Sequence, residues 1–232
     1  KPDIVFRRFE EGPWDNTFNN KSLFLAAGKK VFGWFDFENN LNSGNYSFDI
    51  NTSSIGSINF SSLRGVAYNG EFFALGETDN KNIYIWKGIP GLNDEPDYII
   101  QNPVGVGRID MNDEWLVVSA YPGAGSPVHV INLTNLDSGI MLPVPGNDDF
   151  PQGVSINEKG FFIALQGSNK VVGWSSVQDA LNGSSPTMSF GGTTNKTNSG
   201  TKMASTVHWD GFHLWVGEFK FSNRLLGFAP SK

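Results

Sequence analysis

Cysteine is absent from this chain of 232 residues. Its absence excludes disulfides, thiolate metal sites and a cysteine nucleophile, and it fits any cellular compartment. No apolar run approaches the roughly 20 residues that a membrane-spanning helix needs. The first residue is Lys1 rather than methionine, and no signal peptide is visible. We therefore expect a mature form or an excerpt of a longer protein, and leave open an anchor outside these residues.

Sequence motifs of catalysis are missing as well. There is no G-x-S-x-G for a serine nucleophile, no P-loop and no dinucleotide fingerprint. The glycines of GVGRID (105–110) precede a strand-like segment rather than a helix, so they do not predict a phosphate cradle. Three histidines, His129, His208 and His213, fall at different positions of the repeat described below, which argues against a zinc site. The sequence motifs therefore do not indicate a particular reaction.

Positive charge is in deficit, with 17 Lys and Arg against 23 Asp and Glu and a net charge of −6. A nucleic-acid-binding domain carries a basic stripe, so this balance argues against a nucleic-acid partner. The hydrophobic content of 39% and charged content of 17% are typical of a globular chain. A chain of this length can bury a stable hydrophobic core without disulfides or a structural metal. We predict one all-β domain over residues 1–232.

One pattern recurs along the chain: an apolar strand, a turn with Gly, Asn, Lys or Pro, and an alternating strand. It covers residues 21–35, 70–88, 113–133, 159–176 and 211–229. The later strand of each pair ends at residue 34, 86, 131, 174 or 228, so the units are 43 to 54 residues apart. A period near 40 to 50 residues, with several short strands in each, is the signature of a β-propeller.

Two more strands complete the units. An alternating inner strand precedes the pair, at 65–69, 108–112, 153–157 and 206–210, and that of the first unit must lie near 13–18. An outer strand follows the pair, at 46–50, 97–101, 140–144 and 187–191. Period-two apolar spacing predicts these strands. The blade order is inner, second, third and outer strand, from hub to rim.

The last unit lacks an outer strand. The N-terminal segment PDIVFRRF (2–9) is similar to the outer-strand text PDYIIQNP (96–103). We therefore predict that residues 2–9 pair with the last blade and close the ring, which removes open sheet edges. This gives twenty strands in five four-stranded blades. Six blades is the alternative, if the chain is an excerpt.

Two stretches, NIYIWKGIPGLNDEPDYII (82–100) and NKVVGWSSVQDALNGSSPTMSFG (169–191), resemble the NHL-repeat family of propellers. A blade of that family reads GV-x-hydrophobic-D, a strand, N-[RK]-V-x-hydrophobic-W and P-D-x-hydrophobic. The resemblance covers nearly the whole chain and implies the fold, without an activity. It departs from the family in the blade count, which is commonly six there. The first and third units depart too, with Lys30 and GAGSP (123–127) at the Asn-Arg/Lys turn.

In this architecture the inner strands begin, and the second strands end, on the face that carries the long loops. Elaborated loops on a rigid scaffold commonly hold the functional site. We predict a polar pocket there for a small or glycan ligand, with Tyr121 in an adjoining turn. The candidate ligand-binding residues are Arg64, Glu77, Arg108, Gln152, Gln166 and Glu218. The alternative interpretation is that Arg64–Glu77 or Arg108–Glu77 ion pairs tie the blades together.

Asp110 and His208 share one register of the inner strands, and we consider them as an acid/base pair across the channel. The alternative is that each bonds to the backbone of a neighbouring blade. No cofactor is predicted. Calcium is left open because Asp15, Asn69, Asp110 and Asp210 offer oxygen ligands.

Asn-x-Ser/Thr sequons are in excess. Seven occur, whereas random placement of 24 Asn and 32 Ser or Thr in 232 residues gives about three. N-glycans require exposed loops in an exported protein. The candidates are Asn20, Asn45, Asn51, Asn59, Asn132, Asn182 and Asn195. The alternative is simply a set of polar, Asn-rich loops.

Seven tryptophans raise the question of sugar binding. Trp34, Trp86 and Trp174 occupy one repeat position and are predicted to pack between blades. Trp209 and Trp215 alternate with apolar neighbours, so we expect them in the core as well. Trp14, beside Pro13, is the least constrained.

The sequence thus favours an extracellular or cell-surface propeller that is N-glycosylated and acts as a non-catalytic binding or scaffold domain. Its partner would be a protein or a glycan on the loop-rich face, and homo-oligomerisation stays open. The alternative is a metal-assisted hydrolase or lyase of the lactonase-like kind, with its site at the channel mouth.

Overall fold

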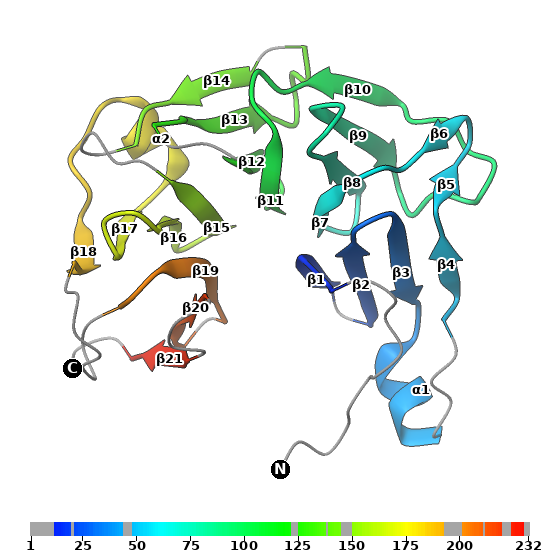
Figure 1. Ribbon diagram of the computed structural model, residues 1–232, viewed down its shortest axis with the longest axis horizontal. Coiled ribbons are helices and arrows are strands. Elements are labelled where there is room, and N and C mark those ends of the chain that lie inside the picture. The colour runs from blue at the N-terminus through cyan, green and yellow to red at the C-terminus, as the bar shows by residue number, and fades with distance from the viewer. Residues whose placement is uncertain are drawn as a thin grey trace.

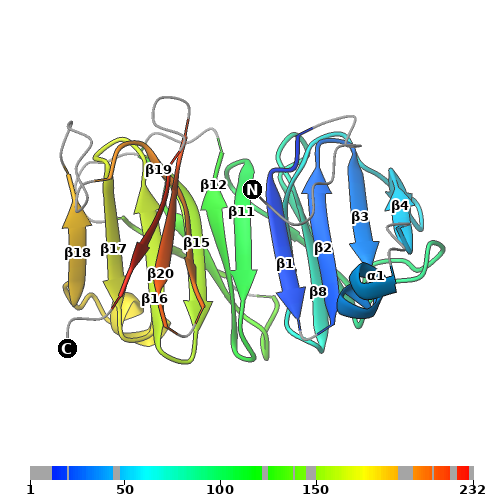
Figure 2. The same cartoon turned by 90° about the horizontal axis from the view of Figure 1, so that it is seen from below.

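Five antiparallel sheets surround a central axis in the computed structural model (Figure 1), and their strands run along that axis (Figure 2). The described residues are 12–19, 21–43, 48–121, 125–137, 139–144, 150–192, 201–210, 212–219 and 224–229, with only the backbone of 41–43. The chain is a five-bladed β-propeller, as its repeat predicts.

Each blade is read from hub to rim. Blade 1 consists of β1 (Asp15–Asn19), β2 (Ser22–Ala27), β3 (Lys30–Trp34) and β4 (Ile50–Thr52). Blade 2 consists of β7 (Leu63–Tyr68), β8 (Phe72–Glu77), β9 (Asn82–Lys87) and β10 (Tyr98–Gln101). Blade 3 consists of β11 (Val106–Met111), β12 (Trp115–Ala120), β13 (Val128–Asn132) and β14 (Gly139–Leu142).

Blade 4 consists of β15 (Pro151–Asn157), β16 (Gly160–Leu165), β17 (Lys170–Trp174) and β18 (Met188–Gly191). Blade 5 shows β19 (Ala204–Trp209), β20 (Leu214–Glu218) and β21 (Leu225–Phe228). The first inner strand lies at β1, where the repeat places it. Closure of the ring by residues 2–9 concerns a segment outside the described residues.

The turn after the inner strand is organised by one polar side chain in blades 2 to 5. The Asn112 Oδ1 atom accepts hydrogen bonds from the backbone N–H groups of Glu114 (3.0 Å) and Trp115 (2.7 Å). The same arrangement recurs at Asn69, Asn157 and Asp210. Asn and Asp form such local turns readily because their short side chains reach the backbone two residues on. The repeat therefore preserves the chemistry of the turn.

Hydrophobic clusters fill the interfaces between consecutive blades from 1 to 5. The inner strands contribute one apolar position each to these clusters, and the four residues are at most 5% exposed: Val66, Ile109, Val154 and Val207. At Gly76 in β8 a Cβ atom would overlap the side chain of Val106 in the next blade. The absence of a side chain there allows blades 2 and 3 to approach.

The repeated tryptophans are buried, as predicted. The indole of Trp86 donates to the backbone oxygen of Asp94 (3.1 Å), and that of Trp174 donates to Ser184 (2.8 Å). Each ring thus fixes the loop that leads to its outer strand, because a buried indole N–H requires an acceptor.

Three features differ from the sequence interpretation. Helices α1 (Phe37–Ser43) and α2 (Val177–Leu181) lie between third and outer strands of blades 1 and 4. A hairpin of β5 (Ser54–Ile55) and β6 (Ile58–Asn59) joins blades 1 and 2. The outer strand of blade 1 is β4, which begins at Ile50, where the predicted strand 46–50 ends. Ile50 packs into the core and anchors this strand. Residues 44–47 lie outside the described part.

Within the described residues, no helix is long and apolar enough to cross a membrane.

Candidate ligand pocket at the hub

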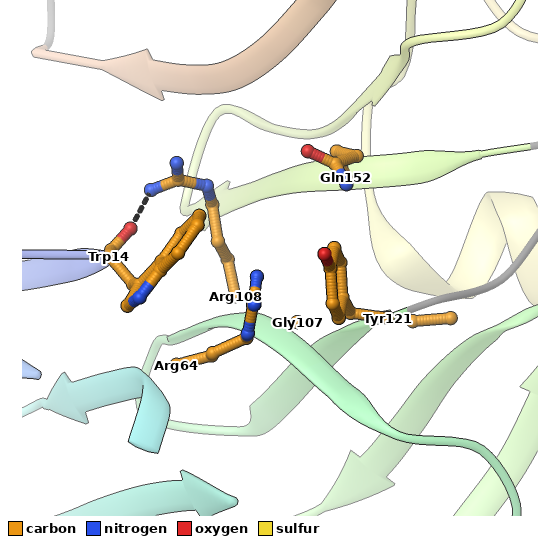
Figure 3. Close-up of a pocket in the computed structure, with 7 residues that line it drawn as sticks. Trp14, Arg64, Gly107, Arg108, Tyr121 and Gln152 are labelled. Atoms are coloured by element: carbon orange, nitrogen blue, oxygen red, sulfur yellow. Dashed lines mark hydrogen bonds between the residues drawn. The ribbon is translucent and has the colours of Figure 1, made fainter. Parts of the chain in front are cut away.

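A small pocket lies at the hub, where inner strands begin and second strands end. Its volume is about 20 Å³, enough for one water-sized group. Four blades or the segments next to them contribute to its wall (Figure 3), namely Trp14, Arg64, Gly107, Arg108, Ala120, Tyr121 and Gln152. The pocket is on the loop-rich face.

Arg64 is held between two aromatic rings. Its Cζ atom lies 3.8 Å from the centre of the Trp14 ring and 3.5 Å from the centre of the Tyr121 ring. Such stacking favours a guanidinium, because the cation faces the negative surface of each ring. The Nε atom of Arg64 is buried and has no hydrogen-bond partner among the described residues. Both faces of this cation are therefore covered, while one of its donors is unsatisfied.

Arg108 is the second cation of the pocket. Its Nη1 atom donates to the backbone oxygen of Trp14 and lies 3.7 Å from Oδ1 of Asp15. Burial lowers the pKa of Arg108, and the positive charge of Arg64 lowers it further, against the opposing effect of Asp15. The two cations are thus close enough to repel one another.

Asp15 lies next to the pocket and links three inner strands. Its Oδ2 atom accepts hydrogen bonds from the backbone N–H groups of Val66 (3.2 Å) and Ile109 (3.1 Å). Burial raises the pKa of Asp15 to about 7, although Arg108 and the two N–H groups oppose the rise. Near neutral pH this carboxyl group is only partly ionised, so it does not fully balance Arg108.

Gln152 forms the opposite side of the pocket. Its Oε1 atom accepts a hydrogen bond from Nε2 of Gln166 (3.3 Å), which leaves its own amide group as a donor. Ser119, behind the pocket, accepts from the backbone N–H of Arg108 (2.7 Å) and donates to the backbone oxygen of Gln152 (3.0 Å). This hydroxyl fixes the spacing between the inner strands of blades 3 and 4.

The structure places Glu77 away from the pocket. Its carboxylate is fully buried and accepts hydrogen bonds from Ser61, Ser62, Asn80 and Tyr84. Burial acts to raise the pKa of Glu77, but the hydrogen bonds from Ser61 and Asn80 outweigh it and the pKa is lowered. The predicted pairing with an arginine is replaced by these contacts, and Arg108 pairs with Asp15 instead.

Glu218 has the same position in blade 5 as Glu77 has in blade 2, and its carboxylate also bonds to groups of its own blade. Its oxygens accept from Nε and Nη2 of Arg224, each at 2.7 Å, and from the backbone N–H of Lys202 (2.5 Å). Of the six candidate ligand-binding residues, the structure therefore brings Arg64, Arg108 and Gln152 together at the pocket. Gln166 supports Gln152, while Glu77 and Glu218 anchor loops of their own blades.

Asp110 bonds to backbone groups, the arrangement weighed as the alternative to acid/base chemistry. Its oxygens accept from the N–H of Met111 (2.9 Å) and from the N–H of Ile156 (2.9 Å) in the next blade. Burial raises the pKa of Asp110 to about 6, and the N–H of Ile156 and the charge of His208 oppose the rise. The side chain of His208 is exposed.

The oxygens considered for calcium have partners within the protein. Those of Asp15 and Asp110 accept backbone N–H groups, and those of Asn69 and Asp210 accept N–H groups in their turns. The described residues contain no group of three or more His, Asp and Glu side chains that could hold a metal ion. His129 lies on β13, where its Nδ1 and Oδ1 of Asn102 are 2.8 Å apart.

Sequence reasoning did not foresee the stacking of Arg64 or the role of Asp15 as a partner of Arg108. Two features of the sequence point weakly to this contact. Trp14 lies outside the repeated positions, and Tyr121 directly follows the second strand of blade 3, on the face where the pocket lies. The contact joins the segment before β1, the inner strand of blade 2 and the turn after β12, which are far apart in the sequence.

No protein-family model and no curated protein matches this sequence. Solved structures do share the fold. A chain in a crystal structure of a nidogen/laminin complex is similar at 11% identity, with a TM-score of 0.65 over 95% of this chain and 81% of that one. The Cps50 (Swd1) β-propeller domain of Myceliophteria thermophila is similar at 10% identity and a TM-score of 0.62, over 93% and 65%.

The computationally designed Ika8 protein is similar at 12% identity, with a TM-score of 0.55 over 93% of this chain and 57% of that one. Likeness at this level of identity shows the propeller fold alone.

Proposed function

We propose that this chain is an NHL-repeat-type propeller that acts outside the cell or at the cell surface as a non-catalytic binding and scaffold domain. The observation that carries the proposal is the hub pocket. It presents two arginines, a tyrosine hydroxyl and a glutamine amide, and its described lining contains no carboxylate, histidine, serine or threonine. Donors without an acid/base partner are suited to holding a ligand rather than to transforming it.

We further propose that the chain carries N-glycans. Asn51 and Asn59, on β4 and β6, are exposed, as is Asn182 directly after α2, and Asn132 is partly exposed at the end of β13. None of these four lines the pocket. Glycans at these positions would leave the pocket face accessible to a protein or glycan partner. The sequons Asn20, Asn45 and Asn195 lie outside the described residues.

A protein partner is supported by analogy of fold. One of the similar chains was solved in a nidogen/laminin complex, a complex between two proteins. Because one fold hosts many functions, the analogy supports protein binding as a class and does not identify the partner. A homo-oligomeric scaffold fits the same features, and light scattering of the purified chain distinguishes a monomer from an assembly.

Glycopeptide mass spectrometry of the protein from its natural source tests the extracellular proposal. We expect occupied sites among the exposed sequons, with Asn51 and Asn59 as the first candidates. Unmodified asparagines throughout, in material that has not been deglycosylated, would remove the support for secretion.

A second candidate is a metal-assisted hydrolase or lyase. The raised pKa of Asp110, about 6, is the observation that favours it, because perturbed carboxyl groups gather at catalytic sites. Metal analysis of the purified protein and lactone assays of the wild type, Asp110→Ala and His208→Ala test it. Turnover that is lost in both variants would replace the binding proposal, and absence of metal and turnover would end this candidate.

A further inference from the structure

The two arginines of the hub pocket narrow the class of its ligand. This inference rests on the proposed binding function. We infer that the pocket binds the carboxylate of a small organic acid or sugar acid, held edge-on by Arg64 with Arg108 as the second cation. The charge of the pocket and the planar shape of the guanidinium lead to this ligand class, and the volume of the pocket limits how much of the ligand enters.

The first argument is the charge balance of the pocket. Arg64 and Arg108 bring two positive charges, and Asp15 is the carboxyl group that contacts them. Asp15 is paired with Arg108 and with two backbone N–H groups, so it does not reach Arg64 through any contact in the described part of the chain. The pocket therefore has an excess of positive charge in a chain of net charge −6. A bound anion removes this local repulsion.

The second argument is the orientation of Arg64. Its two faces are covered by Trp14 and Tyr121, so its hydrogen-bond donors are confined to the edge of the guanidinium plane. Figure 3 shows the two rings on either side of this side chain, with a guanidinium nitrogen of Arg64 pointing toward the region of Arg108 and Gln152. A planar carboxylate meets a guanidinium edge through two parallel hydrogen bonds.

The protein itself contains the geometry expected for the complex. In blade 5, Arg224 donates from Nε and from Nη2 to the two oxygens of Glu218, each at 2.7 Å. Arg64 has no such carboxylate among the described residues, and its buried Nε atom is without an acceptor. A ligand carboxylate at the guanidinium edge would supply Arg64 with the opposite charge that Glu218 supplies to Arg224.

The third argument is size. A pocket of about 20 Å³ holds one water-sized group rather than a whole ring. One carboxylate oxygen would enter, and the remainder of the acid would stay outside, toward the loop-rich face. A tetrahedral oxyanion such as sulfate places oxygens out of the guanidinium plane, where Trp14 and Tyr121 lie.

Arginine side-chain NMR of the full chain tests the inference directly. Acetate is the minimal probe, and acetamide is its neutral counterpart of the same shape. We expect acetate to shift the Nε–H signal of Arg64 in a saturable manner, while the signal of Arg224 stays in place. Acetamide should leave both unchanged. The variant Arg64→Lys keeps the charge but loses the planar fork, and should weaken acetate binding at least tenfold.

Arg224→Lys is the matched control and should retain the acetate affinity of the wild type. A melting curve recorded for each variant separates loss of binding from loss of folding, and Gln152→Ala provides a second, uncharged change in the pocket wall. The inference is overturned if acetate leaves Arg64 unshifted, if acetamide or sulfate competes as well as acetate, or if Arg64→Lys binds like the wild type.

Competition identifies the source of the carboxylate. D-glucuronate that displaces acetate more strongly than N-acetylglycine assigns a sugar acid, and the reverse order assigns a peptide-like acid. Failure of both to displace acetate would contradict a ligand carboxylate. These results are independent of glycan occupancy, so a protein with unmodified sequons can still bind acetate, and a glycosylated protein can fail to.

Discussion

Asp15 is an ionisable group whose buried surroundings disfavour its charged form. It is 9% exposed, and burial raises its pKa to about 7 in spite of Arg108 and two N–H donors. In the unfolded chain the pKa returns to its ordinary value near 3.8. Between these two values the folded state binds a proton that the unfolded state has released. Stability therefore falls as the pH rises through this window.

We predict that Asp15→Asn removes much of this pH dependence. The asparagine keeps an oxygen for Val66 and Ile109 but cannot ionise. In urea unfolding, the wild type should lose up to about 1 kcal/mol per pH unit between pH 4 and 7, and the variant should show a shallower slope with higher stability at pH 8. Asp110 contributes to the same window, so some slope remains. The exposed Asp113→Asn is the control, and identical slopes in all three proteins would contradict the assignment.

At the scale of the element, the turn after the inner strand depends on a single side chain in blades 2 to 5. We predict that Asn112→Ala destabilises the protein by about 1–2 kcal/mol, because the N–H groups of Glu114 and Trp115 lose their acceptor. Asn112→Asp should be nearly neutral, since Asp210 performs this role in blade 5. Thermal or chemical unfolding measures both. Equal stability of the alanine variant and the wild type would show that water replaces the contact.

The strands were predictable for a physical reason. Val66 and Tyr68 in β7, and Ile109 and Met111 in β11, are two residues apart, the spacing that places side chains on one face of a strand. The helices were not, because α2 covers only five residues and depends on a local cap. The Ser176 hydroxyl accepts from the N–H of Asp179 (3.1 Å). A helix of five residues is too short to leave a periodic signal in the sequence.

At the scale of the whole molecule, the candidate site was predictable in part. Alignment of the repeats places Arg64, Arg108 and Gln152 on one face, because each begins or lies near the beginning of an inner strand. It could not predict which cations meet which aromatic rings. That depends on how the blades tilt about the axis, and the contact of Arg64 with Trp14 and Tyr121 joins segments from three blades.

Ring closure by residues 2–9 stays a prediction. Replacing residues 2–9 by a glycine-serine linker of equal length should lower the melting temperature and promote self-association, because the edge of β21 would lose its proposed partner. Differential scanning calorimetry and light scattering measure the two effects. A substituted chain as monomeric and heat-resistant as the wild type would show that the ring is not closed in this way.

The bonds of Asp15 also bear on how the protein comes apart. One carboxyl group of β1 reaches N–H groups of β7 and of β11, so blades 1, 2 and 3 share a contact that blade 5 lacks. Partial opening should begin at the far end of the series, with the amides of β19 and β20 exchanging with deuterium sooner than those of β7 and β11. Blades 1, 2 and 3 would then stay folded while blade 5 opens, and blade 5 would pack again onto the blades that remain folded.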